Sequence, residues 1–184
     1  MLSEQLQEGG RGPAAGAGAS LSLAYIGRIA RETGIREVVY GLRLARERGV
    51  LPRLVIAGSG EDEAHLRSVV ETLDLTEDVH FPGPVLAEAR LRLLRCVDLS
   101  VLPRCGTGLL QTLHYSLLAG VPVIAVRTGS ASDAIVDKVH GLLLPSCEPE
   151  EYGDAMCRLA FDRGLLAQMR DACRAWQQGV RSAA

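Results

Sequence analysis

The sequence predicts an α/β fold, in which a doubly wound parallel sheet forms a Rossmann-like single domain. Three observations lead to this prediction. Hydrophobic residues make up 47% of the 184, short apolar runs alternate with segments of helical spacing, and residues 98–125 contain strand, glycine turn, apolar helix and strand in succession. A strand–helix–strand unit of this length crosses over right-handed and gives parallel strands. We therefore expect the strand order 3-2-1-4-5-6.

Each expected element rests on its own apolar pattern. Strands are expected where apolar residues form short runs, over residues 21–26, 53–57, 79–81, 97–102, 121–126 and 142–144. Helices are expected where apolar residues recur at helical spacing, over 35–45, after the acidic turn 61–63, over 86–95 and 109–119, around 134–136, from 149, and around 165–176. Because the helix over 109–119 is apolar around most of its circumference, we expect it to be buried.

Composition excludes several classes of function. A formal net charge of −2 gives no electrostatic basis for binding nucleic acid or an anionic membrane. No apolar run approaches the roughly 20 residues of a transmembrane segment. The five cysteines are an odd number without CxxC spacing. They indicate a reduced, cytoplasmic chain, with most thiols packed as small hydrophobes and no metal site.

The domain organisation follows from a change in composition. Residues 1–20 end in a stretch rich in glycine and alanine, which has too little apolar area to fold and behaves as a flexible linker. Such a stretch is a linker or a tail, and it suggests that either another domain or an artificial boundary of the chain precedes it. The Rossmann-like domain is expected over 21–178, with a tail over 179–184.

A binding crevice is expected where the strand order reverses, between the strand 21–26 and the strand 97–102. The turn Gly106-Thr107-Gly108 leads into a helix, whose amide N–H groups and dipole would hold a phosphate, although a tight turn also needs small residues. Arg28 follows the other strand. Its guanidinium would bind a diphosphate through two N–H groups, and a solvated loop arginine is the alternative.

Other polar residues allow both a functional and a structural interpretation. Gly58-Ser59-Gly60 allows either close approach of a nucleotide or a simple turn from strand to helix. The following helix has no third glycine and the preceding strand does not end in an acidic residue that could bind a ribose, which argues against NAD as a ligand. His114 is a satisfied buried or half-buried histidine rather than a catalyst. For Asp133, capping of a helix competes with ligand contact.

Six stretches together carry a family resemblance. They are YIGR at 25–28, LVIAGSG at 54–60, VHFPG at 79–83, VDLSVLP at 97–103, AGVPVIA at 119–125 and the segment 133–145. In this order and spacing the chain resembles, over about 23–176, the C-terminal, donor-nucleotide-binding domain of GT-B glycosyltransferases of the retaining, glycogen-synthase-like superfamily. It looks most like their group 1 (family 4) branch.

The resemblance implies a nucleotide-diphosphate sugar as donor substrate, no further cofactor and no bound metal. It assigns catalytic roles to Arg28 and Thr107. It assigns donor-binding roles to Gly27, Thr33, Gly58, Gly60, Phe81, Gly106, Gly108, Leu109, Leu110 and Tyr115.

Several of these positions depart from the family pattern. Thr107 and Tyr115 stand where the family has the two glutamates of its Glu-x7-Glu motif. Thr33 stands in place of the family's diphosphate-binding lysine, and Leu110 in place of its second loop glycine. Each lost charge-assisted hydrogen bond is worth about 1.5–3 kcal/mol, so we expect a weakened donor site.

The resemblance predicts a glycosyltransferase-like domain that binds a nucleotide-sugar donor. It would transfer the sugar only with an acceptor-binding N-terminal domain, in the same or another chain, and not alone. The alternative is a catalytically degenerate binding or scaffold domain of the same fold. An epimerase or phosphorylase of GT-B fold ranks below both.

Overall fold

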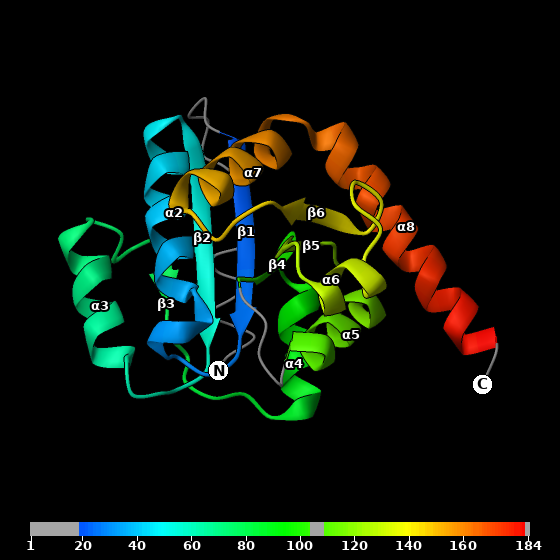
Figure 1. Cartoon of the computed structure of the whole chain (residues 1–184), viewed down its shortest axis with the longest axis horizontal. Helices are drawn as coiled ribbons and strands as arrows, with labels where there is room; N and C mark the ends of the chain where they lie inside the picture. The colour runs from blue at the N-terminus through cyan, green and yellow to red at the C-terminus, as the bar shows by residue number, and fades with distance from the viewer. Residues whose placement is uncertain (1–18, 104–108, 183–184) are drawn as a thin grey trace.

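The computed structural model describes residues 19–103 and 109–182. Six parallel strands in this part of the chain form one sheet with the order β3-β2-β1-β4-β5-β6 (Figure 1). The strands are β1 (Ala19–Ile26), β2 (Val50–Ala57), β3 (Val79–His80), β4 (Leu99–Leu102), β5 (Val123–Val126) and β6 (Gly141–Leu144). The helices are η1 (Arg31–Thr33), α2 (Ile35–Glu47), α3 (Glu63–Thr72), α4 (Ala87–Arg95), α5 (Leu109–Ala119), α6 (Gly129–Ala134), α7 (Pro149–Phe161) and α8 (Arg163–Ser182). The predicted fold class and strand order are confirmed.

Helices cover both faces of the sheet because successive strand residues point to opposite sides. In β1, Leu21, Leu23 and Tyr25 pack in the core that α2, α3 and α7 share, while Ala24 and Ile26 pack on the other face beside α4. A separate cluster joins α5 and α8 to β5. Figure 1 shows α7 crossing in front of the strands beside α2, and α8 running away from the sheet toward the C-terminus of the chain.

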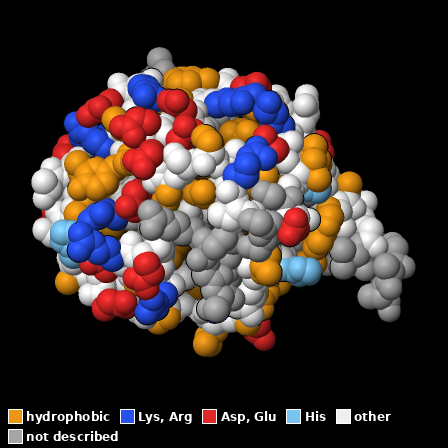
Figure 2. Space-filling model, in the orientation of Figure 1, with side chains coloured by type: hydrophobic (Ala, Val, Ile, Leu, Met, Phe, Trp, Pro, Cys, Tyr) orange, Lys and Arg blue, Asp and Glu red, His pale blue; other side chains and the backbone are white. Residues whose placement is uncertain are grey.

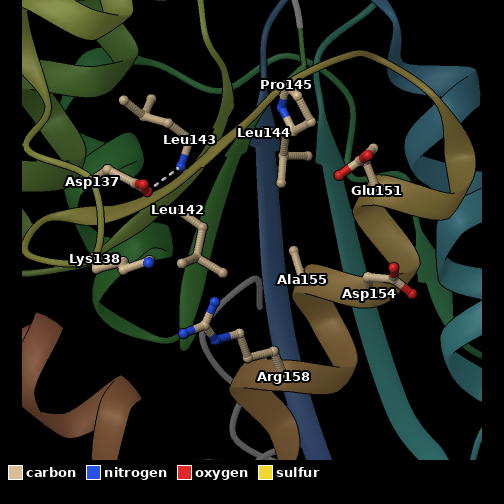
Figure 3. Close-up of a pocket in the computed structure, with 10 residues that line it drawn as sticks. All are labelled: Asp137, Lys138, Leu142, Leu143, Leu144, Pro145, Glu151, Asp154, Ala155 and Arg158. Carbon is tan, nitrogen blue, oxygen red and sulfur yellow. Dashed lines mark hydrogen bonds between the residues drawn. The ribbon is translucent and has the colours of Figure 1, made fainter.

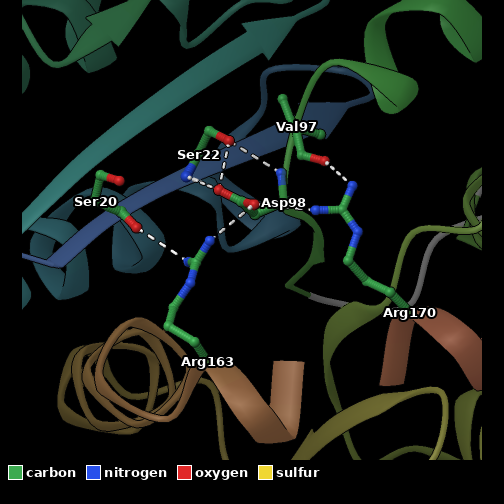
Figure 4. A network of polar contacts seen from close by, with 6 residues as sticks. All are labelled: Ser20, Ser22, Val97, Asp98, Arg163 and Arg170. Atoms are coloured by element: carbon green, nitrogen blue, oxygen red, sulfur yellow. Dashed lines mark hydrogen bonds and ion pairs between the residues drawn. The ribbon is translucent and has the colours of Figure 1, made fainter. Parts of the chain in front are cut away.

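A polar network at the amino end of β4 joins α8 to the sheet (Figure 4). The Asp98 carboxylate accepts hydrogen bonds from the Ser22 backbone N–H at 3.0 Å and from the Ser22 hydroxyl at 2.8 Å. Its other oxygen lies 3.1 Å from Arg170 and 3.7 Å from Arg163. Arg163 and Arg170 also donate to the backbone carbonyls of Ser20 and Val97, so α8 is held at both strands.

The structure corrects the expected environment of α5. Thr112, Leu113, Ser116 and Leu117 are buried, but the side chain of Leu110 is 52% exposed. As an outer-layer helix, α5 has one face to bury, against β4 and between α4 and α8. The prediction that this helix is buried therefore holds for its inward face and is wrong for its outward face.

Smaller corrections concern element boundaries. The helix expected around 134–136 lies at Gly129–Ala134, and Ile135 is already extended. β1 begins at Ala19, and α8 continues to Ser182, so ordered structure extends beyond the expected limits of 21 and 178.

The cysteines are less uniformly buried than expected. Cys173 is buried, and burial raises the pKa of its thiol to about 12. Cys147 and Cys157 are half-buried against the core, and Cys96 is exposed. All four are free thiols, and Cys105 lies outside the described residues.

The surface is electrostatically mixed. Figure 2 shows acidic and basic side chains interspersed on the face that carries α2 and α3. Among the described helices, none combines the length and the apolar composition that crossing a membrane requires.

Candidate functional site

The candidate site lies where the strand order reverses, between the carboxyl ends of β1 and β4. Ile26 ends β1, and the segment 27–30 follows it. On the other side Leu102 ends β4, Pro103 follows it, and α5 begins at Leu109. The predicted residues Gly106, Thr107 and Gly108 fall between these points, outside the described residues.

Backbone packing holds the segment after β1. The Gly27 N–H donates to the Ala57 carbonyl at 3.1 Å, and the Ile29 N–H donates to the Ser59 carbonyl at 2.9 Å. A Cβ atom on Gly58 would lie 1.8 Å from the Gly27 oxygen, and one on Gly60 would lie 2.0 Å from the Ile29 oxygen. The two glycines are therefore required for close approach of this neighbouring backbone, which the sequence analysis did not consider.

Two hydroxyl groups fix the same loop from inside. The Tyr25 hydroxyl donates to the Arg28 carbonyl at 2.6 Å, and the Thr33 hydroxyl donates to the Ala30 carbonyl at 2.6 Å. Burial raises the pKa of Tyr25, and the nearby Thr33 hydroxyl partly opposes this shift. The Thr33 hydroxyl thus bonds to its own turn, and both groups shape the backbone that carries Arg28.

The Arg28 side chain projects from this loop and is 59% exposed. Its guanidinium is ion-paired with Glu32 in η1 and, at 3.4 Å, with Glu61 in the loop before α3. The sequence analysis placed Glu61 only in the acidic turn before a helix and did not consider Glu32. Arg28 precedes the short helix η1, whose N-cap Ala30 is extended, so the i,i+4 rule for helices does not predict the pair with Glu32.

Thr112 closes the other side of the crevice. Its hydroxyl is buried and donates to the Ile26 carbonyl at 3.3 Å, which ties the start of α5 to the end of β1. Ser116, four residues later, is also buried and donates back to the Thr112 carbonyl. A polar pair at this spacing, on a helix that is mostly apolar, was the signal that the sequence analysis missed.

Known proteins share this sequence pattern and this arrangement. A family model described as glycosyl transferases group 1 matches residues 20–162. The chain belongs to this family. The resemblance expected from the sequence, to the C-terminal domain of group 1 GT-B enzymes, is therefore confirmed.

Individual relatives of this glycosyltransferase domain cover different parts of it. It is 29% identical over 119 residues to the D-inositol 3-phosphate glycosyltransferase of Salinispora arenicola, and 29% identical over 166 residues to that of Pseudarthrobacter chlorophenolicus. These matches cover 64% and 85% of this chain but only 27% and 40% of the relatives. The chain therefore spans less than half the length of these curated relatives.

Solved structures show the same fold. Anabaena Alr3699/HepE in complex with UDP superposes with a TM-score of 0.76 at 16% identity, covering 99% of this chain and 50% of that one. The C-terminal domain of the group 1 glycosyl transferase LpcC from Francisella tularensis superposes with a TM-score of 0.71 at 20% identity, covering 83% of this chain and 82% of that one.

Two residues that the resemblance assigns to donor binding lie on α5 of this glycosyltransferase-family chain. Leu110 is exposed, and Tyr115 is half-buried, with the Arg90 guanidinium 5.9 Å from the centre of its ring. Arg90 also donates to Gln111 at 3.2 Å and to the Val85 carbonyl at 3.4 Å. Tyr115, which the resemblance places at a carboxylate position of the family motif, thus has its aromatic ring beside a cation.

Phe81 lies apart from this group. It follows β3, the edge strand two positions from β1 in the sheet, and the Arg67 guanidinium lies 4.2 Å from the centre of its ring. His114 is exposed, contrary to the expectation of burial, and its ring meets Trp176 edge-on at 5.4 Å. Asp133 is exposed in α6, whose N-cap is Thr128, so it does not cap that helix.

The loop that ends β4 is anchored from α7. The buried Tyr152 hydroxyl donates to the Pro103 carbonyl at 3.0 Å, and the Cys147 sulfur lies 3.4 Å from that hydroxyl. A Cβ atom on Gly41 would lie 2.5 Å from the Tyr152 Cβ, so α2 and α7 cross closely at this point. The helix pair thereby positions the last described residue before the predicted donor loop.

A pocket of about 230 Å³ lies elsewhere, between β6 and α7 (Figure 3). The side chains of Lys138 and Arg158 point toward Leu142 from two sides in this view. The Asp137 carboxylate accepts a hydrogen bond from the Leu143 N–H at 2.9 Å, which satisfies an outward group of the edge strand. None of the residues predicted for the site lines this pocket.

No set of three or more His, Cys, Asp or Glu side chains within 19–103 and 109–182 is arranged to hold a metal ion. The described site therefore offers one arginine, its two glutamates, and loops whose backbones are held by glycine packing and hydroxyl groups.

Proposed function

We propose that this chain is the donor-binding half of a glycosyltransferase and that it binds a nucleotide-diphosphate sugar in the crevice between β1 and β4. The observation that carries the proposal is the placement of Arg28. In a chain that belongs to the group 1 glycosyl transferases, a guanidinium extends from a rigidly held loop at the point where the strand order reverses. Guanidinium groups bind phosphate oxygens through paired N–H groups.

The contribution of this half to catalysis would be electrostatic. Arg28, with the amide groups of 106–109, would stabilise negative charge on the departing diphosphate, while Thr107 and Tyr115 would approach the sugar and the ribose. Transfer would require the acceptor-binding half, in the same or another chain, and would use no bound metal or other cofactor. We place the reaction in the cytoplasm.

Calorimetric titration of the purified chain with UDP, GDP and ADP, and then with the matching nucleotide sugars, tests the proposal. UDP is the first ligand to use, because Alr3699/HepE is a structural neighbour solved with it. We expect one nucleotide to bind in the micromolar to millimolar range, about −8 to −4 kcal/mol, and Arg28→Ala to abolish this binding. Chelation of divalent metal should leave the affinity unchanged.

A suitable control is Arg174→Ala. Arg174 is also an exposed arginine paired with a carboxylate, Asp171 at 3.2 Å, but it lies on α8, which contributes none of the residues assigned to the site. Binding that is equally weakened by both substitutions would contradict the assignment of Arg28. Sugar transfer by the purified chain alone would contradict the need for an acceptor half.

A scaffold function is the second candidate, and the surroundings of Tyr115 favour it. Arg90 faces the Tyr115 ring where the family pattern has a carboxylate. If the site has only decayed, Tyr115→Glu together with Thr107→Glu should restore nucleotide affinity. No gain in a folded variant would indicate a site turned to another use.

A further inference from the structure

We propose that Glu32 and Glu61 weaken anion binding in the crevice, because they occupy the Arg28 guanidinium until a ligand phosphate displaces them. This inference rests on the proposed function, because it concerns the diphosphate of the same donor. It predicts that removing the two carboxylates strengthens the binding of a nucleoside diphosphate more than that of a monophosphate.

The two carboxylates reach Arg28 from different elements. One guanidinium nitrogen pairs with Glu32 in η1, and the other lies 3.4 Å from Glu61, which follows β2. Both nitrogens that would hold a diphosphate are therefore already engaged.

The backbone keeps these three side chains together. The Asp62 N–H donates to the Ile29 carbonyl at 3.2 Å, next to the close approach at Gly60. Arg28 and Glu61 thus extend from two loops that are hydrogen-bonded to each other. The carboxylates remain near the arginine even when a ligand takes their place.

The exposure of the cluster makes exchange feasible. The side chains of Arg28, Glu32 and Glu61 are 59%, 61% and 62% exposed. Exposed ion pairs are worth about 0.2–1 kcal/mol each, so a bidentate phosphate contact can replace them. The displaced carboxylates then repel the bound anion, and this repulsion increases with the charge of the ligand.

A ligand series of graded charge tests the inference. Uridine has no phosphate, UMP has one and UDP has two, so titrating the full chain with each separates charge from base recognition. In the variant carrying both Glu32→Gln and Glu61→Gln, we expect UDP affinity to rise on the order of 3- to 10-fold, as two exposed like-charge contacts would produce. UMP affinity should rise less, and uridine affinity should not change.

The control is Glu63→Gln. It removes an exposed glutamate that is paired with an arginine four residues away on α3. It should leave all three affinities unchanged. An equal gain for uridine, or a gain of the same size from Glu63→Gln, would overturn the inference.

The inference and the proposed function fail in different ways. If Arg28→Ala abolishes UDP binding and the double variant binds UDP like the wild type, the glutamates have no such role and the donor site stands. If Arg28→Ala leaves nucleotide binding unchanged, or if the folded wild-type chain and the double variant both fail to bind UDP, GDP and ADP, the proposed function is wrong and the inference with it.

Discussion

Two arginine–carboxylate clusters lie toward opposite ends of β1, and their environments differ. Toward the amino end, the Asp98 side chain is 19% exposed and is shared by two arginines and Ser22. Beyond the carboxyl end, the Arg28 side chain is 59% exposed and is shared by two glutamates. One cluster is enclosed by strands and α8, whereas the other is open to solvent.

The difference indicates how each end is stabilised. At the amino end the charged groups themselves join α8 to the sheet. At the carboxyl end the loops are held by neutral contacts, namely the close approaches at Gly58 and Gly60 and the Thr112 hydroxyl. Because the backbone holds the loops there, the charged side chains remain exchangeable for a ligand.

The largest effect on stability is expected at the amino end. Asp98→Ala would leave the Ser22 N–H without its acceptor, and Arg170 and Arg163 with only their backbone carbonyl acceptors, in a partly buried site. We expect the free energy of unfolding to fall by about 3 kcal/mol, because removing one member of a buried pair leaves the other uncompensated. Urea unfolding measures this.

The matched control for that prediction is Asp171→Ala. Asp171 also pairs with an arginine, Arg174 at 3.2 Å, but its side chain is 74% exposed. Its removal should leave the urea midpoint nearly unchanged. Equal destabilisation by the two substitutions would show that enclosure of the Asp98 cluster does not matter.

The next effect tests whether backbone packing holds the carboxyl-end loops. Gly60→Ala places a Cβ atom 2.0 Å from the Ile29 oxygen, so one loop must move. We expect a loss of about 2 kcal/mol in unfolding free energy together with weakened UDP binding. Gly179→Ala is the control, because Gly179 lies in α8 with open space around it, and alanine there should stabilise slightly. An unchanged stability for Gly60→Ala would contradict the packing argument.

A smaller effect is expected from the neutral hydrogen bond across the crevice. Thr112→Val keeps the shape of the side chain but removes the hydroxyl that donates to Ile26. We expect about 1 kcal/mol of destabilisation by urea unfolding. Thr72→Val provides the comparison, since the Thr72 hydroxyl is exposed and bonds to Ser68 within its own helix. An equal loss of unfolding free energy in Thr72→Val would contradict a specific role for the Thr112 hydroxyl.

The smallest effect on stability is expected for the open cluster. Glu32→Gln with Glu61→Gln should change the unfolding free energy by less than about 0.5 kcal/mol. The gain in UDP affinity should shrink as salt rises from about 0.1 M to about 1 M, where the Debye length falls from about 10 Å to about 3 Å. A large loss of stability would show that the Arg28 cluster is structural, like that of Asp98.

Much of the fold could be predicted from local pattern. Apolar runs located all six strands, and the apolar spacing of 109–119 predicted the bounds of α5. The burial of α5 could not be predicted in this way. Leu110 and Leu113 are equally apolar in the sequence, and only the position of α5 in the outer layer, between α4 and α8, exposes the first and buries the second.

The candidate site, too, could be predicted only in part from the sequence. The sequence was enough to predict the strand order, the family and the place of Arg28 after β1, because these follow from the succession of elements and motifs along the chain and from the strand order common to such folds. The tertiary structure was needed to show that Gly58 and Gly60 accommodate the neighbouring loop, and that Glu61 reaches Arg28 from another strand's loop. Such contacts between loops depend on the register of neighbouring strands, and local pattern does not specify that register.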